Sequence, residues 1–134
     1  MESLTVSGIV FSSLPVRGGT HWYFLEVSDP DGYTGVAEFT SGDRSLEVAR
    51  TIAGLADEIR GVAIASDTDL PYALDVSQAL LERDRVLAAA MSALRSAMLD
   101  AQAQRAGVPM WELLNPAAAD GSSPVRLYGN INRS

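Results

Sequence analysis

The chain has 134 residues, 47% of them hydrophobic, which is long enough for one domain with a buried core. It contains no cysteine, no lysine and a single histidine, which excludes disulfides, thiolate and Schiff-base chemistry, and any metal site built from several histidines. The net charge of −7 argues against nucleic-acid or anionic-lipid partners, and with no signal peptide or membrane span recognisable in the sequence we expect a cytoplasmic protein.

The first forty residues contain three strand patterns. Loosely alternating Val, Ile and Phe residues predict a strand over 4–14, and an aromatic, β-branched run predicts a second over 20–28. The turn sequence DPDG at 29–32 then leads into a third strand over 33–39. Together they predict an antiparallel meander within residues 1–40, which needs a covering layer to be stable.

The segment after the meander, residues 43–114, is predicted to be mostly helical. A first helix should begin at a cap, either Asp43 or Ser45, and run to about Arg60, with Gly61 as its stop. Its candidate core residues are Leu46, Ile52, Leu55 and Ile59. Residues 62–69 should be irregular, and residues 71–81 should form a further helix.

A long amphipathic helix is predicted from a cap at Asp84 to a glycine stop at Gly107. Its apolar residues recur at i, i+4, i+7, i+11 and i+14, so that they share one stripe. These residues are Leu87, Met91, Leu94, Met98 and Ala101. Pro109 suits the first turn of a short helix that follows, whose apolar face is Met110, Leu113 and Leu114.

Small and polar residues over 117–124 (AAADGSSP) predict a linker, and the apolar run over 125–131 predicts a strand. A lone strand leaves backbone groups unpaired on both edges. Either it folds back onto the meander, or it is the first strand of a second domain.

The segments SALRSAMLDAQAQRAGVPMWELL (92–114) and VRLYGNINRS (125–134), together with the order of elements, resemble the N-terminal capping domain of the enolase superfamily, mandelate racemase/muconate lactonizing enzyme type. The chain departs from the family pattern at 115–116, where Asn-Pro stands in place of a glycine pair. The positions that match the family motif are Ala90, Ser92, Ala93, Leu94, Ala97, Asp100, Gly107, Pro109, Leu113 and Leu114.

The resemblance implies an α+β fold, a three-stranded antiparallel meander followed by a helical bundle. The capping domain would span residues 1–116, with its meander over 1–40 and its helices over 43–114. A linker over 117–124 would lead to residues 125–134, an extra C-terminal strand that would begin a (β/α)7β barrel missing from this sequence.

The resemblance also implies that the chemistry lies outside this chain. In the family, the barrel supplies three acidic ligands for Mg²⁺ and the Lys or His residues that abstract a proton α to a carboxylate, in racemases, dehydratases and cycloisomerases. We therefore expect no catalytic residue, metal ligand or cofactor in this chain, and Mg²⁺ in the full-length enzyme. The expected partners are a small carboxylic acid, the barrel domain and further copies in a homo-oligomer.

Two loops of the family's capping domain contact the substrate, and the first corresponds to residues 14–21 (LPVRGGTH). The Arg17 guanidinium could pair bidentately with a substrate carboxylate; the alternative is a solvated loop arginine. Gly18 and Gly19 suit a lid hinge or a plain turn. His21 could donate to a substrate hydroxyl, or it is simply a partly exposed strand residue.

The second loop corresponds to residues 39–43 (FTSGD). Phe39 could form an apolar wall, and Thr40 or Ser41 could hydrogen-bond a hydroxylated substrate. The alternative is that this segment is only a helix lead-in with a capping residue.

Asn132 and Arg133 follow the predicted barrel strand, whose carboxyl end would face the active site and place them near a bound polar acid. The alternative is an unstructured tail. In a different class of function, the chain would be a non-catalytic interaction module that self-associates. Either hypothesis predicts self-association of the free chain through exposed apolar residues, with Trp111, Leu114, Leu127 and Tyr128 as the candidates.

Overall fold

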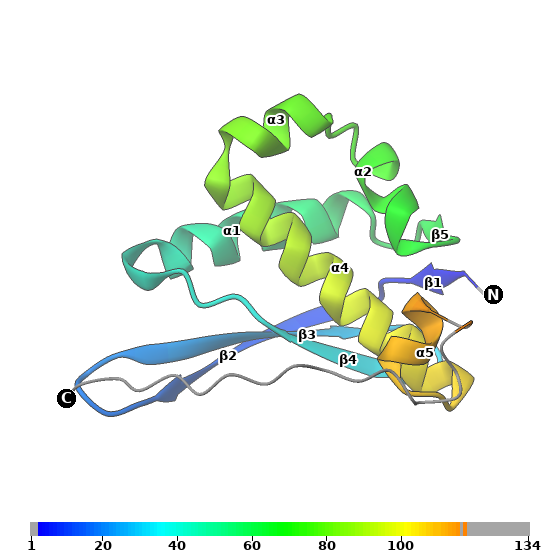
Figure 1. Cartoon of the computed structure of the whole chain (residues 1–134), viewed down its shortest axis with the longest axis horizontal. Helices are drawn as coiled ribbons and strands as arrows, with labels where there is room; N and C mark the ends of the chain where they lie inside the picture. Colours follow the sequence, from blue (N-terminus) through cyan, green and yellow to red (C-terminus); the bar gives the residue numbers. More distant parts are fainter. Residues whose placement is uncertain (1–2, 116, 118–134) are drawn as a thin grey trace.

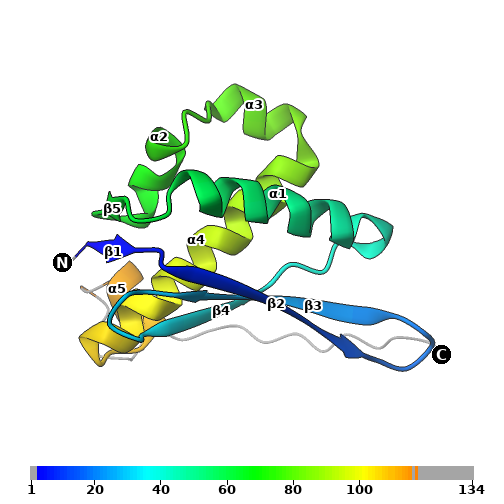
Figure 2. The same cartoon turned by 180° about the vertical axis from the view of Figure 1, so that it is seen from behind.

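A computed structural model describes residues 3–115 and 117 of the chain, and it has two layers (Figure 1). One layer is a three-stranded antiparallel sheet in the order β2 (Gly8–Pro15), β3 (His21–Ser28) and β4 (Thr34–Glu38). The helices cover one face of this sheet, as the view from behind also shows (Figure 2). The predicted α+β meander and helical layer are therefore confirmed, whereas residues 118–124 of the predicted linker and the predicted strand over 125–134 lie outside the described residues.

The pairing of β2 with β3 is longer than the pairing of β3 with β4. β2 pairs with β3 along its whole length, from Gly8 opposite Ser28 to Pro15 opposite His21, whereas β4 pairs only with the segment Phe24–Ser28. Strands β2 and β3 therefore continue as a two-stranded ribbon past the end of β4, and both views show this ribbon extending beyond the helices (Figures 1 and 2).

The strand predicted over 4–14 is in fact two strands. Residues Leu4–Thr5 form β1, which leaves the meander and pairs with β5 (Ala63–Ile64), a segment predicted to be irregular. The physical reason is burial, since Leu4 and Val6 are completely inaccessible to solvent in the core. Alternation along the chain indicates a strand but does not say which segment will pair with it.

The long helix α4 (Arg85–Ala106) confirms its prediction at both ends and along its apolar stripe. The Asp84 carboxylate caps it by accepting hydrogen bonds from the amides of Val86 and Leu87, both at 3.0 Å. Gly107 ends it in the left-handed conformation at φ +68°. The stripe residues buried in the core are Met91, Leu94, Met98 and Ala101, with Leu87 partly buried beside them. The short helix α5 (Met110–Leu114) follows Pro109.

Strand β4 meets helix α4 at a glycine. A Cβ atom on Gly35 would lie closer than 3.0 Å to the carbonyl oxygen of Ala97 and to the amide nitrogen of Ala101. On the same turn of the helix, the Asp100 carboxylate accepts a hydrogen bond from the Val36 amide at 2.8 Å. Because β4 is an edge strand, this bond covers a backbone donor and fixes the strand to the helix. The motif residue Asp100 thus has a structural role.

Two predictions about the remaining helices are wrong. In α1 (Ser45–Glu58), Leu46 is 59% exposed, whereas Val48 is buried together with the predicted Ile52 and Leu55. A 3₁₀ turn, η1 (Gly42–Arg44), precedes the helix. The buried stripe of α1 begins at Ser45, and Leu46 falls outside it because, at about 100° per residue, Leu46 lies about 120° from Ile52 around the helix.

The helix predicted over 71–81 is broken into two. After η2 (Asp67–Asp69), helix α2 (Leu70–Ala73) ends before Asp75, which has φ +50°, and α3 (Gln78–Arg83) starts afresh. The Ser77 hydroxyl accepts a hydrogen bond from the Leu80 amide at 3.2 Å and so caps the new helix.

The turn between β3 and β4 is fixed by a buried carboxylate. One oxygen of Asp29 accepts hydrogen bonds from the amides of Asp31 and Tyr33, both at 2.9 Å, and the other pairs with the Arg105 guanidinium. Arg105 also pairs with Asp31 and donates to the carbonyl oxygen of Ser3. The end of α4 thus holds both the hairpin turn and the start of the described chain.

Candidate functional site

The two loops predicted to face a substrate lie side by side. A surface hollow of about 440 Å³ is lined by Gly19, Thr20, His21, Trp22 and Tyr23 from the first loop and β3, and by Thr40 and Gly42 from the second loop. The pairing of β3 with β4 produces this arrangement, because β4 ends opposite Phe24 and delivers the second loop next to the start of β3. This hollow is the candidate site.

The first loop is a tight turn that carries Arg17 at the tip of the ribbon. The Val16 amide donates to the Thr20 carbonyl at 2.8 Å, and Gly18 and Gly19 have φ values of +86° and +77°. Side chains with a Cβ rarely adopt such angles, so the paired glycines are required by the turn itself. Arg17 is exposed, is not among the residues that line the hollow, and makes no ion pair with the described residues.

In the second loop, the Thr40 and Ser41 side chains have different surroundings. The Thr40 hydroxyl oxygen accepts a hydrogen bond from the Tyr23 amide at 2.9 Å and leaves its own proton free to be donated into the hollow. The Ser41 hydroxyl donates to the Phe39 carbonyl at 3.0 Å. The Ser41 amide donates to the Ser45 hydroxyl at 2.8 Å, so that Ser45 holds the lead-in to α1. Asp43 does not cap this lead-in.

Phe39 is 5% exposed and lies in the core below the loops. Its ring centroid is 5.7 Å from that of Phe11 in an edge-to-face arrangement and 6.0 Å from that of Tyr23. Such ring pairs stabilise one another beyond their burial. Phe39 therefore supports Tyr23, a lining residue of the hollow, from within the core.

The sequence analysis missed Trp22 and Tyr23 as lining residues. Both directly follow His21, whose ring centroid is 6.3 Å from that of Tyr23. The sequence signal that could have identified them is the presence of two consecutive aromatic residues at the end of a loop, because one of two neighbouring side chains on a strand must face outward. The other predicted residues, Asn132 and Arg133, lie outside the described residues.

Ser41 lines a different hollow, of about 240 Å³, between the starts of α1 and α4, together with Arg44 and Arg85. Arg44 makes two hydrogen bonds of 2.9 Å with the Glu47 carboxylate. This contact raises the pKa of Arg44 and lowers the pKa of Glu47. Arg44 is thus already neutralised within the chain.

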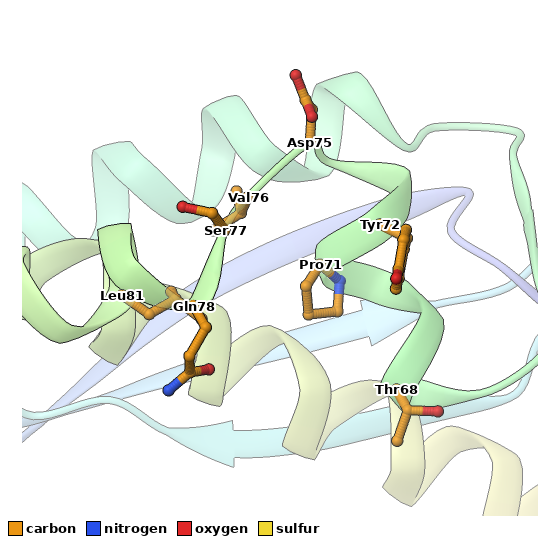
Figure 3. A pocket seen from close by; sticks show the side chains of 8 residues that line it. All are labelled: Thr68, Pro71, Tyr72, Asp75, Val76, Ser77, Gln78 and Leu81. Carbon is orange, nitrogen blue, oxygen red and sulfur yellow. The ribbon is translucent and has the colours of Figure 1, made fainter.

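A hollow of about 470 Å³ lies between α2 and α3 (Figure 3). The polar ends of Asp75, Ser77 and Gln78 point in different directions there, as Figure 3 shows. A binding site usually has a few polar groups that converge on one ligand. We therefore place the candidate site at the two loops.

The candidate site contains groups for recognition. Arg17 offers a cation, and His21 and Thr40 offer hydrogen-bond donors beside two aromatic rings. Among residues 3–115 and 117, no three His, Cys, Asp or Glu side chains gather where they could hold a metal ion. No helix in this part of the chain is both long and apolar enough to cross a membrane.

Comparison with known proteins gives a family match over most of the chain. The family described as mandelate racemase / muconate lactonizing enzyme, N-terminal domain, matches residues 12–115. A D-galactonate dehydratase family member from Pseudarthrobacter chlorophenolicus is 28% identical over 133 residues, which cover 95% of this chain and 30% of that protein.

Solved structures show the same fold. A mandelate racemase/muconate lactonizing enzyme from Bordetella bronchiseptica is 26% identical with a TM-score of 0.70, covering 84% of this chain and 33% of its own. Muconate lactonizing enzyme from Pseudomonas putida is 26% identical with a TM-score of 0.65, covering 83% of this chain and 32% of its own. A Burkholderia xenovorans protein named for an L-alanine-DL-glutamate epimerase activity, solved with magnesium and fumarate, is 25% identical with a TM-score of 0.68, covering 84% and 27%. The chain thus spans about a third of the length of these relatives.

Proposed function

This chain belongs to the mandelate racemase / muconate lactonizing enzyme N-terminal domain family, and from that premise we propose that it is the substrate-facing capping domain of an enzyme acting on a small carboxylic acid. The observation that carries the proposal is the hollow at the two loops. It brings His21 and Thr40 together from segments that are separate in the sequence, and Arg17 belongs to the turn that leads into this hollow. The hollow would form one wall of an active site that a barrel domain completes.

In this proposal, the described residues bind and orient the acid. The Arg17 guanidinium pairs with the substrate carboxylate, because its planar fork of donors matches the two carboxylate oxygens. His21 and Thr40 donate hydrogen bonds to substrate hydroxyls, and the buried Phe39 ring keeps Tyr23 in place beside them. Asn132 and Arg133 remain further proposed contacts, whereas Ser41 lines the separate hollow between α1 and α4.

The reaction we propose is abstraction of the proton α to the carboxylate, as in racemases, dehydratases and cycloisomerases. Magnesium would stabilise the charge that develops on the carboxylate during this step. In this proposal the ligands for such an ion and the acid–base residues are supplied by the barrel domain. The Pseudarthrobacter relative favours a hydroxylated sugar acid as substrate.

An NMR titration of the free chain tests the recognition half of this proposal. We expect D-galactonate at millimolar concentration to shift the amide signals of residues 17–23 and 40–42, and galactitol, which has the hydroxyls but no carboxylate, to do so far less. Arg17→Ala should abolish the shifts, whereas Arg50→Ala, a change to another exposed arginine on α1, should not. Equal shifts with both ligands, or no effect of Arg17→Ala, would contradict the role of Arg17.

The catalytic half is tested in a chimera in which this chain replaces the matching segment of the Pseudarthrobacter relative. We expect turnover of a hydroxy acid by the chimera, a raised KM with Arg17→Ala, and no turnover by the free chain. Turnover by the free chain would place the chemistry within it and refute the proposal.

A further inference from the structure

Strand β4 gives way to the second loop through an exchange of hydrogen-bond partners. Continuing the register of β3 and β4 by one residue places Tyr23 opposite Phe39, and the Phe39 amide donates to the Tyr23 carbonyl at 2.9 Å. In a regular ladder the Tyr23 amide would donate to the Phe39 carbonyl in return. Here the Tyr23 amide donates to the Thr40 hydroxyl oxygen at 2.9 Å, and the Ser41 hydroxyl donates to the Phe39 carbonyl at 3.0 Å. The ladder therefore ends on the Thr40 side chain, at the hollow.

This exchange determines what the Thr40 hydroxyl can offer to a ligand. A hydroxyl group has one proton to donate and an oxygen that accepts. The Thr40 oxygen already accepts from the Tyr23 amide, and its proton has no acceptor among the described residues, so the proton is available in the hollow. The direction of this donor depends on where the second loop holds Thr40 relative to β3.

The second loop is anchored by Ser45, the first residue of α1, which is 1% exposed. The Ser45 hydroxyl donates to the Gly42 carbonyl at 2.8 Å and accepts from the Ser41 amide at 2.8 Å. Its one proton and its oxygen are thus both used within the loop. Because the side chain is buried, water cannot readily replace either bond.

The direction of these bonds is unusual for a serine at the start of a helix. Such a serine ordinarily caps its own helix by accepting from an amide two or three residues later. The N-cap of α1 is instead Arg44, which makes no capping hydrogen bond through its side chain. Both bonds of the Ser45 hydroxyl run backward, to residues that precede the helix. The hydroxyl therefore holds the loop and does not cap α1.

We propose that Ser45 is a positioning residue for substrate recognition. Its buried hydroxyl fixes the second loop so that Thr40 meets the Tyr23 amide and presents its proton to the hollow. Ser45 itself lines neither the candidate site nor the neighbouring hollow that Ser41 lines. The inference rests on the proposed function, because a substrate in the hollow is what the Thr40 proton would serve.

Amide hydrogen exchange of the whole chain, followed by NMR without any ligand, tests whether Ser45 holds the loop. Ser45→Ala should speed exchange of the Ser41 and Tyr23 amides at least about tenfold relative to the Val36 amide, because the loop then opens locally. The Val36 amide is bonded to α4 and reports on the fold as a whole. Ser77→Ala is the matched control, since the Ser77 hydroxyl also accepts from a backbone amide, at the start of α3. This control should leave the relative rates unchanged.

A titration with D-galactonate tests whether this positioning matters for binding. Ser45→Ala should raise the Kd about fivefold, the effect of weakening one hydrogen bond, in a chain that circular dichroism shows to be folded. Ser45→Thr, which keeps a hydroxyl, should restore the original Kd, and Ser77→Ala should leave it unchanged. A purely structural serine would lower the melting temperature in Ser45→Ala without changing the Kd.

A double-mutant cycle tests whether Ser45 acts through Thr40. Thr40→Val removes the hydroxyl with little change of shape and should itself raise the Kd for D-galactonate. Adding Ser45→Ala to this variant should change the Kd by less than about twofold, because residues in one hydrogen-bond network do not act additively. Thr40→Val also leaves the buried Ser45 in place, so it remains informative if Ser45→Ala does not fold: it should speed exchange of the Tyr23 amide but not of the Ser41 amide.

Three outcomes would overturn the inference. Unchanged relative exchange of the Tyr23 amide in Ser45→Ala would show that Ser45 does not hold Thr40, whether or not galactonate binds. An unchanged Kd in Ser45→Ala, or effects of Ser45→Ala and Thr40→Val that multiply, would exclude positioning through Thr40. An unaltered chain that binds no galactonate would instead refute the proposed function, and the exchange of Tyr23 would then decide the placement of Thr40 by itself.

Discussion

The contact between β4 and α4 makes a sharp prediction about two glycines. In Gly35→Ala, the new Cβ would lie closer than 3.0 Å to two backbone atoms of α4, whereas ordinary van der Waals contact begins at 3.4 Å. The backbone of a packed helix does not rotate away as a side chain would, so strand and helix must separate. Gly54, inside α1, is the matched control, because a Cβ there would have nothing within 4 Å.

The expected magnitudes have opposite signs. Overpacking usually costs about 1–3 kcal/mol, and we place Gly35→Ala at the upper end, about 3 kcal/mol, since separation would also stretch the bond between Val36 and Asp100. At about 4 °C per kcal/mol for a domain of this size, the melting temperature would fall by about 12 °C. Gly54→Ala should instead stabilise the chain by about 0.5–1 kcal/mol, because alanine favours an exposed helix.

Urea unfolding followed by tryptophan fluorescence measures both free energies, and a thermal scan by circular dichroism gives the melting temperatures. A Gly35→Ala variant that unfolds at the same or a higher urea concentration than the original chain would refute the close approach of β4 to α4. A Gly54→Ala variant that loses as much stability as Gly35→Ala would show that the loss comes from glycine replacement in general.

Three further predictions concern stability and use the same urea assay. Arg105→Met should cost about 3–5 kcal/mol because it leaves the fully buried Asp29 carboxylate without its main cation, and a loss below 1 kcal/mol would contradict that pairing. Ile52→Ala should cost about 2–4 kcal/mol, whereas Leu46→Ser should change stability by less than about 0.5 kcal/mol. A larger loss with Leu46→Ser than with Ile52→Ala would contradict the burial of Ile52 and the exposure of Leu46. The contact with Arg44 lowers the pKa of Glu47 in the folded chain. The contact therefore stabilises the fold above the ordinary pKa of 4.5, and this stabilisation is lost as the pH falls through the lowered pKa. Glu47→Gln should remove a small part of the stability near pH 7 and none at about pH 2.

The parts of the fold that the sequence predicts correctly depend on local signals. Asp84 and Gly107 mark the ends of α4 because a cap and a left-handed stop act within a few residues of the chain. The turn at 29–32 likewise determines the hairpin between β3 and β4. In contrast, β1 pairs with β5 across about sixty residues of sequence. The alternation of apolar residues within either segment does not indicate which distant segment it will pair with.

The candidate site was predicted in outline through the resemblance, and its details depend on packing. The two loops indeed lie together, but the sequence does not show that Phe39 turns into the core while Trp22 turns out. Side-chain direction alternates along a strand, so a shift of one residue in the expected strand position decides which aromatic side chains face the core. Ser41 lines another hollow for a similar reason, since the Ser45 hydroxyl holds its amide.

The hold of Arg105 on the Ser3 carbonyl has a consequence for how the domain is made. Ser3 and Arg105 are 102 positions apart, so residues at the start of the described chain are bound by residues near its end. The nascent chain can form the hairpin between β3 and β4 early, but it cannot close the two layers until α4 has been synthesised. Contacts between distant residues also slow folding, so we expect refolding from urea to be slower than in helical bundles of similar size.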